Sequence, residues 1–304
     1  MNYLLRRLAF MVPLLVLISL AAFVLIRLAP GGPFDRERQV PPEIERQLNQ
    51  KYHLDQPVWR QYVRFLGGLA RGDLGPSMRY RNHTVNEIIA AGLPVTLTIG
   101  FLAFGLALGV GIPLGFYAAI YRGRPLDHVA SLLALVAICT PTFVAGPVLV
   151  MLFGVKLRWL PVALWESPAH VVLPVFTLGI YFAGRVARLM REGMLQTLHA
   201  SFIVTARAKG LSENRIFWRH AFPLGVLPVV SYSGPLLADL LTGSFVVENL
   251  FQIPGIGVFL VNSSLNRDYT MVVGLVLLYA VLLVVLNLVV DLAYAMLDPR
   301  VRHD

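Results

Sequence analysis

Long apolar runs separated by shorter polar segments dominate this chain. Each run has 20 to 27 residues, and the six are Leu8–Ala29, Val95–Tyr121, Val129–Phe153, Val171–Met190, Leu224–Val247 and Val272–Met296. At about 1.5 Å of rise per residue, a helix of this length crosses a hydrocarbon core about 30 Å thick. The pattern predicts an all-α polytopic membrane protein with six transmembrane helices. Prolines in the third and fifth runs leave open whether those spans are kinked or broken.

Composition excludes the other broad classes of protein. The chain is 57% hydrophobic and 14% charged, with a mean hydropathy of +0.67, whereas soluble domains are about 45–50% apolar and about 25% charged. A soluble enzyme and a disordered chain are therefore excluded, and a single cysteine, Cys139, excludes a disulfide scaffold. The net charge of +9 is explained by basic cytoplasmic loops rather than by a nucleic-acid site.

The distribution of lysine and arginine predicts the orientation in the membrane. Thirteen basic residues lie at the N-terminus, after the second run, between Arg185 and Arg219, and in the C-terminal tail. The two short loops facing the other way contain only Lys156, Arg158 and Arg267. Because cytoplasmic loops carry the excess of basic charge, both termini are expected in the cytoplasm, with residues 30–94 outside.

The outer segment has a helical pattern of its own. Helices are expected over Pro41–His53 and Pro57–Ala70, each begun by a proline, with a turn over Arg71–Pro76. We therefore expect a small helical cap outside the membrane. Its core is expected to consist of aromatic residues, namely Tyr52, Trp59 and Tyr62.

Motifs for catalysis and metal binding are absent from the sequence. None of the three lysines, Lys51, Lys156 and Lys209, follows a glycine, so no phosphate-binding G-x-x-x-x-G-K-[ST] loop exists. The H-E-x-x-H motif is absent, and one cysteine with seven scattered histidines forms no metal-ligand pattern. The chain is expected to be a transport subunit, not an enzyme, with no catalytic residues, no metal and no cofactor of its own.

A basic segment between the fourth and fifth runs is the most distinctive feature. It is expected to form a helix, a glycine turn and a second helix, with Gly210 left-handed and Ser212 capping the second helix. Small residues alternate here with long cations, which suits a surface that enters a groove of another protein. A loop that merely sets topology by its positive charge is the alternative.

This segment, Thr205–Leu211, resembles the "EAA" loop of ABC importer permeases. The glycine of that pattern is Gly210, and the proline thirteen residues beyond it is Pro223. The chain departs from the pattern at Thr205, which replaces the glutamate, and at Arg207, which replaces the second alanine. The resemblance implies that an ATPase subunit is contacted by Thr205, Ala206, Arg207, Ala208, Lys209, Gly210, Leu211 and Pro223.

Further motifs resemble the peptide/nickel branch of these permeases. They are Gly72-Asp73-Leu74-Gly75 with Ser77, Gln252-Ile253-Pro254-Gly255-Ile256-Gly257, and Asp298-Pro299-Arg300. The stretch Arg27–Gly31 together with Lys51–Pro57 is most similar to the B-type subunit of oligopeptide permeases. The resemblance implies a type I ABC importer permease fold. It divides the chain into an N-terminal transmembrane helix (1–29), an extracytoplasmic cap (30–94) and a five-helix core (95–304) with a coupling loop at about 191–223.

The resemblance also implies an assembly in a bacterial cytoplasmic (inner) membrane. A second, homologous permease subunit would complete a heterodimer embedded in membrane lipid. Two ABC ATPase subunits would bind ATP and Mg²⁺, and an extracytoplasmic substrate-binding protein would deliver oligopeptides. Permeases of the same branch for dipeptides, nickel or glutathione are alternatives. A secondary transporter and an intramembrane enzyme are less favoured alternatives.

Three further residues are candidates for substrate or partner contacts. Asp239 lies within the fifth run, where a carboxylate is costly unless it faces a cavity or a partner. It is expected either to line the translocation path or to make a structural hydrogen bond. Trp159 and Trp165 lie in an outer loop, where they would face the binding protein or belong to an interfacial aromatic belt.

Overall fold

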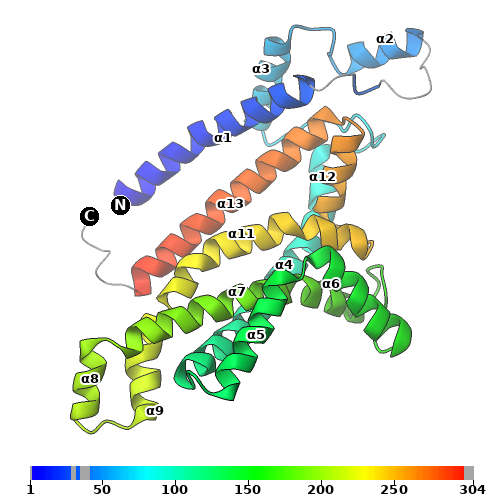
Figure 1. Cartoon of the computed structure of the whole chain (residues 1–304). Helices are drawn as coiled ribbons and strands as arrows, with labels where there is room; N and C mark the ends of the chain where they lie inside the picture. Colours follow the sequence, from blue (N-terminus) through cyan, green and yellow to red (C-terminus); the bar gives the residue numbers. More distant parts are fainter. Residues whose placement is uncertain (1, 29–31, 35–41, 298–304) are drawn as a thin grey trace. The chain divides into compact units, whose positions relative to one another are not determined.

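The computed structural model describes residues 2–28, 32–34 and 42–297, and these residues are largely helical. Five of the described helices are long and apolar enough to cross a membrane, and a bent pair makes up to six. The five are α1 (Asn2–Leu28), α4 (Val85–Ile120), α7 (Val172–Leu198), α11 (Leu227–Leu250) and α13 (Tyr269–Leu297) (Figure 1). The predicted all-α membrane fold is confirmed. The Asp298-Pro299-Arg300 motif lies outside the described residues.

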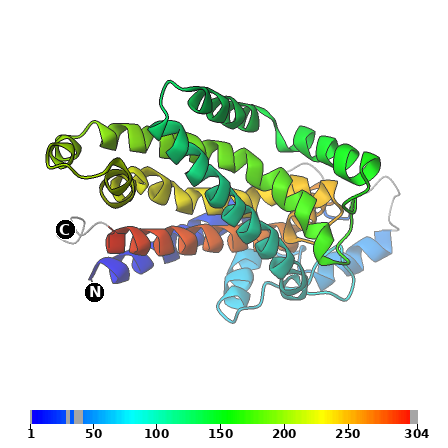
Figure 2. The same cartoon turned by 90° about the horizontal axis from the view of Figure 1, so that it is seen from below.

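The third predicted span is broken rather than continuous. Its first half is α5 (Pro125–Cys139), and its second half is α6 (Thr142–Leu149) followed by the π-helix η1 (Val150–Lys156). The halves meet at 105°, a bend visible in Figures 1 and 2. Thr140 is extended (φ −90°, ψ 108°) because it precedes Pro141, whose ring disfavours a helical residue before it.

Helices α4 and α7 extend furthest beyond the apolar runs that predicted them. Helix α4 begins ten residues earlier than predicted, and α7 ends at Leu198 rather than Met190. Arg191, which lies beyond the predicted run, is therefore inside α7 together with Arg185 and Arg188, although the charge asymmetry counted all three with a cytoplasmic loop. Without these three arginines, ten basic residues remain on the predicted cytoplasmic side and three in the short outer loops, so the charge asymmetry persists.

One of two compact units comprises Met1–Val95 and Pro254–Val284. The helices of its outer segment are α2 (Pro42–Lys51) and α3 (Val58–Leu69), close to their predicted positions, and α12 (Ile256–Leu265) belongs to the same unit. Tyr62 of α3 packs edge-on against Phe23 of α1, with ring centroids 5.1 Å apart. The Tyr62 hydroxyl oxygen also lies 2.9 Å from the Oγ atom of Ser19, within hydrogen-bond distance. Trp59, expected in this core, is instead 62% exposed.

A buried carboxylate orders the loop that precedes α4. The side chain of Asp268, which is fully buried, accepts hydrogen bonds from Ser77 Oγ at 2.5 Å and from the backbone nitrogens of Met78 and Arg79 at 3.2 and 3.1 Å. It also accepts from the nitrogen of Met271 in the first turn of α13. This role explains Ser77 as a structural residue of the loop.

The other unit comprises Thr96–Ile253 and Val285–Asp304, and α7 is its central helix. Helices α5, α6, α11 and the short α10 (Phe222–Gly225) all contact α7, and Figure 1 shows α5 and α11 along it. The approach of α10 depends on Gly193, because a Cβ atom there would lie 2.2 Å from the carbonyl oxygen of Gly225. The chain beyond α7 is therefore held against the last turns of that helix.

Candidate functional site

The predicted coupling segment is a helix that ends in a glycine turn. Helix α8 (Ser201–Ala208) is followed by Gly210 at φ +77°. The Gly210 nitrogen donates to the Arg207 carbonyl at 2.9 Å, and the Leu211 nitrogen donates to the Ala206 carbonyl at 3.3 Å. This pair of bonds is the Schellman motif, which requires a left-handed residue at the position of Gly210. The conformation predicted for Gly210 is confirmed.

Arg207 and Glu213 link the two arms of this turn. The Arg207 Nε and Nη2 atoms donate to the two Glu213 carboxylate oxygens at 2.7 and 3.1 Å, so α8 is bonded to α9 (Glu213–Arg215) (Figure 1). The hydrogen bond from Arg207 lowers the pKa of Glu213, and the same bond raises the pKa of Arg207. Arg207, which is expected to contact an ATPase subunit, also has a partner within the chain, and the contact with the ATPase stays a prediction.

The pKa shift fixes the sign of a small pH effect. A carboxyl group whose pKa is lowered on folding stabilises the turn above its unfolded pKa, and the contribution disappears as pH falls through the lowered value. Glu213→Gln mimics the protonated state. Because both side chains are about half exposed, the loss is expected to be at most about 1 kcal/mol. Hydrogen exchange of residues 205–215 at neutral pH should accelerate by no more than about fivefold. A larger acceleration would contradict this surface role.

The segment has one buried side and one exposed side. Ile203 and Ala206 of α8 and Ile216 after α9 are buried, which fixes α8 against the π-helix η3 (Ile216–Ala221). The small size of Ala206 therefore serves packing within the chain. The exposed predicted residues are Thr205, Arg207, Ala208, Lys209, Gly210 and Pro223, and Leu211 is half-buried. The apolar residues Phe202 and Val204 lie on the exposed side as well, and they are 41% and 59% exposed.

The second arm of the turn departs from a regular α-helix. Ser212 occupies the N-cap position of α9 with an extended backbone, but its side chain makes no capping hydrogen bond. Pro223 is the second residue of α10. Because a proline has no N–H to donate to the residue four positions earlier, it favours the wider π-turns of η3 just before it.

An aromatic cluster connects this arm to α4. The ring centroid of Trp218 in η3 lies 4.5 Å from that of Phe116 in α4 and 5.5 Å from that of Phe222. Displacement of η3 would therefore disturb α4 through these rings. Trp218 was not predicted from the sequence, because it stands there close to the charged residues Arg215 and Arg219.

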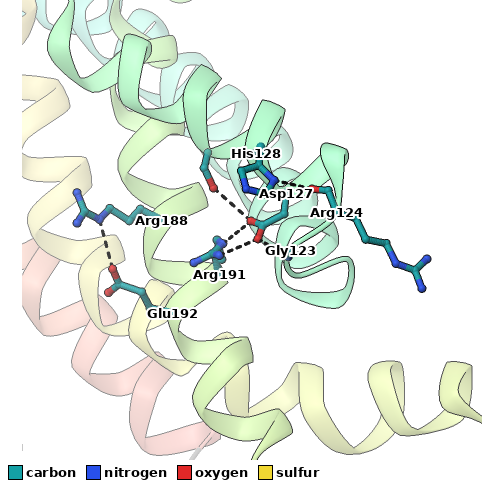
Figure 3. A network of polar contacts seen from close by, with 8 residues as sticks. Gly123, Arg124, Asp127, His128, Arg188, Arg191 and Glu192 are labelled. Carbon is teal, nitrogen blue, oxygen red and sulfur yellow. Dashed lines mark hydrogen bonds and ion pairs between the residues drawn. The ribbon is translucent and has the colours of Figure 1, made fainter.

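A buried ion pair fixes the start of α5 to α7. Arg191 Nε and Nη2 donate to the two carboxylate oxygens of Asp127 at 2.7 and 2.9 Å, and the Gly123 nitrogen donates to Asp127 at 3.0 Å (Figure 3). Asp127 is 5% exposed. In the same view Arg188 and Glu192 form a separate pair, at 3.3 Å, that is mostly exposed. From the sequence, Arg188 and Arg191 were predicted only to be charges that set the topology.

Two acidic residues of α11 have contrasting environments. Asp239 is exposed, and among the described residues its carboxylate has no hydrogen bond or ion pair, so no partner for a purely structural bond is present there. Glu248 is fully buried, and its Oε1 atom accepts from Thr96 Oγ1 at 2.7 Å and from Ser244 Oγ at 2.8 Å. Glu248 was missed because the predicted fifth span ended one residue before it.

The two outer tryptophans also differ in exposure. Trp159 is 70% exposed and lies 6.0 Å from the ring of Phe153. Trp165 is half-buried. Among the described residues, no three histidine, cysteine, aspartate or glutamate side chains are grouped so that they could bind a metal ion.

Comparison with known proteins agrees with this architecture. The family model described as "Binding-protein-dependent transport system inner membrane component" matches residues 111–303. The oligopeptide transport system permease proteins OppB of Haemophilus influenzae and Salmonella typhimurium are 39% and 41% identical to this chain, over 100% of each chain. The dipeptide transport system permease protein DppB of Bacillus subtilis is 38% identical, over 99% of this chain and 98% of its own.

A solved structure matches the fold at lower sequence similarity. The inward-facing MetNI methionine ABC transporter has a chain that superposes with a TM-score of 0.58 at 16% identity, over 69% of this chain and 96% of that chain. With the family match over 111–303 and full-length relatives at about 40% identity, the chain belongs to the family of inner-membrane components of binding-protein-dependent transport systems.

Proposed function

We propose that this chain is the membrane-spanning subunit of an ATP-driven importer that takes up oligopeptides. The observation that carries the proposal is similarity to oligopeptide permeases along the entire length of both chains. Family membership argues against a secondary transporter. Similarity to the dipeptide permease is slightly lower, so dipeptides are the second candidate substrate.

The partners follow from this role. A second permease subunit would form a heterodimer with the chain, and an extracytoplasmic binding protein would deliver the peptide. Two ATPase subunits would bind ATP and Mg²⁺, because this chain has no phosphate-binding loop. The exposed side of α8 and the Gly210 turn would dock on one of these ATPases. The exposed Trp159 is a candidate contact for the binding protein, with Trp165 beside it in the same loop.

Reconstitution tests this function directly. Proteoliposomes that contain the assembled importer should accumulate a labelled pentapeptide only when ATP and the loaded binding protein are both present. The isolated chain should hydrolyse no ATP. Uptake driven by an ion gradient without ATP, or ATP hydrolysis by the chain purified free of other ATPases, would contradict the proposal.

The orientation can be tested with single cysteines. In a Cys139→Ser background, Gln50→Cys is on the exposed surface of α2 and Asn214→Cys is on the exposed surface of α9. We expect a membrane-impermeant maleimide to label residue 50 from outside and residue 214 only after the cells are opened. The reverse pattern would place both termini outside and overturn the charge-based orientation.

A further inference from the structure

Arg185 is a charged residue inside the apolar run of a transmembrane helix. It is the middle residue of α7 and lies within the run Val171–Met190. An arginine inside a span is costly, and such residues face a bundle interior or a water-filled cavity rather than lipid. A position of this kind indicates a functional role, and topology does not explain it.

Neutral aromatic residues orient the Arg185 guanidinium. It donates to the hydroxyl oxygen of Tyr232 at 3.3 Å and to that of Tyr181. Its Cζ atom lies 4.7 Å from the Tyr181 ring centroid and 5.8 Å from that of Phe182. These contacts fix the side chain without neutralising it. Among the described residues no carboxylate forms an ion pair with Arg185.

A negative charge, that of Asp239, lies on α11 two helical turns from Tyr232. Asp239 follows Tyr232 by seven residues on α11, so the two lie on one side of that helix, about 10 Å apart along its axis. Among the described residues Asp239 forms no ion pair with Arg185. Because α7 and α11 contact each other and Arg185 bonds to Tyr232, this seam carries a cation and an anion that are not bonded to each other.

We propose that Arg185, positioned by Tyr181 and Tyr232, and Asp239 together form a transient binding site for a zwitterionic peptide in the translocation path. Arg185 binds the terminal carboxylate, for which its planar guanidinium is suited, and Asp239 binds the terminal ammonium group. An extended tripeptide is about 10 Å long, which is close to the axial spacing on α11 between Asp239 and Tyr232, the contact of Arg185. The site rests on the proposed peptide function and names the groups of the substrate that are recognised.

Chemically modified tripeptides test the site. Uptake of trialanine, its C-terminal amide and its N-acetyl derivative is measured in proteoliposomes with the assembled importer, per molecule of loaded binding protein. Because the same binding protein serves each variant, its own preferences cancel in the ratio of variant to wild type. Arg185→Gln should lower uptake of free trialanine roughly tenfold and remove the advantage of trialanine over its amide. Asp239→Asn should remove the advantage over the N-acetyl derivative.

Matched variants separate recognition from assembly. Arg188 lies one turn from Arg185 on α7, in an exposed pair with Glu192. Arg188→Gln should keep the wild-type ratios of trialanine uptake to uptake of the amide and of the N-acetyl derivative. Tyr232→Phe should reduce the preference for the free carboxylate only partly, since Tyr181 still contacts Arg185.

Three results would overturn the site. The first is that Arg185→Gln and Asp239→Asn both keep the wild-type preference for trialanine over its amide and over its N-acetyl derivative. The second is loss of co-purification with the second permease in these variants, which would assign the charges to a subunit interface. The third is a wild-type complex that transports free and modified tripeptides equally well. Failure of wild-type importer to take up any peptide would instead overturn the proposed function.

Discussion

Gly210→Val should abolish peptide uptake by the assembled importer without preventing membrane insertion. Gly210 adopts φ +77°, and a Cβ atom built there meets nothing within 4 Å, so the cost of valine is conformational rather than steric. A non-glycine residue in the left-handed region costs roughly 1–2 kcal/mol, and relief of that strain would break the two Schellman bonds that orient α8. Uptake of labelled peptide and ATP hydrolysis by the same proteoliposomes measure the effect.

Conservative changes at the same turn provide the controls. Gly210→Asn should retain most of the uptake, because asparagine tolerates the left-handed region far better than a β-branched residue. Arg207→Ala should also be mild, since its pair with Glu213 is about half exposed and such pairs contribute about 0–1 kcal/mol. Normal transport by Gly210→Val would reduce the segment to a topogenic signal.

The sequence predicted the elements that depend on local chemistry. The apolar runs predicted the spans, the prolines before α2 and α3 predicted the helices of the outer segment, and Gly210 predicted the turn after α8. Each of these features is determined by residues close together in the chain. The limits of α4 and α7 were missed because polar and basic residues continue both helices beyond their apolar parts.

Features that depend on distant residues could not be predicted in this way. The pair between Asp127 and Arg191 joins residues 64 positions apart, and the bond between Arg185 and Tyr232 joins residues 47 apart. In the sequence, both arginines are indistinguishable from charges that mark a cytoplasmic loop. In the structure both lie on α7, where Arg185 contacts Tyr232 of α11 and Arg191 contacts Asp127 at the start of α5.

Asp127→Asn should destabilise the chain more than any change at an exposed ion pair. The Asp127 side chain is 7% exposed and that of Arg191 is 29% exposed, so the neutral amide would leave a largely buried guanidinium without its counter-charge. Removal of one partner of a buried pair costs about 3–5 kcal/mol, and the water that still reaches Arg191 favours the lower value. The thermal midpoint of the purified assembled importer is expected to fall by on the order of 5–10 °C.

A double variant distinguishes an unpaired charge from a lost contact. Asp127→Asn combined with Arg191→Met should be more stable than Asp127→Asn alone, because the uncompensated charge is gone and the methionine still packs between α5 and α7. Glu192→Gln, which removes the exposed pair with Arg188, should shift the midpoint very little. Equal shifts for Asp127→Asn and Glu192→Gln would show that the buried pair does not stabilise the contact between α5 and α7.

If the pair does position the last turns of α7, beyond which α8 begins, Asp127→Asn should also lower peptide uptake at temperatures well below its midpoint.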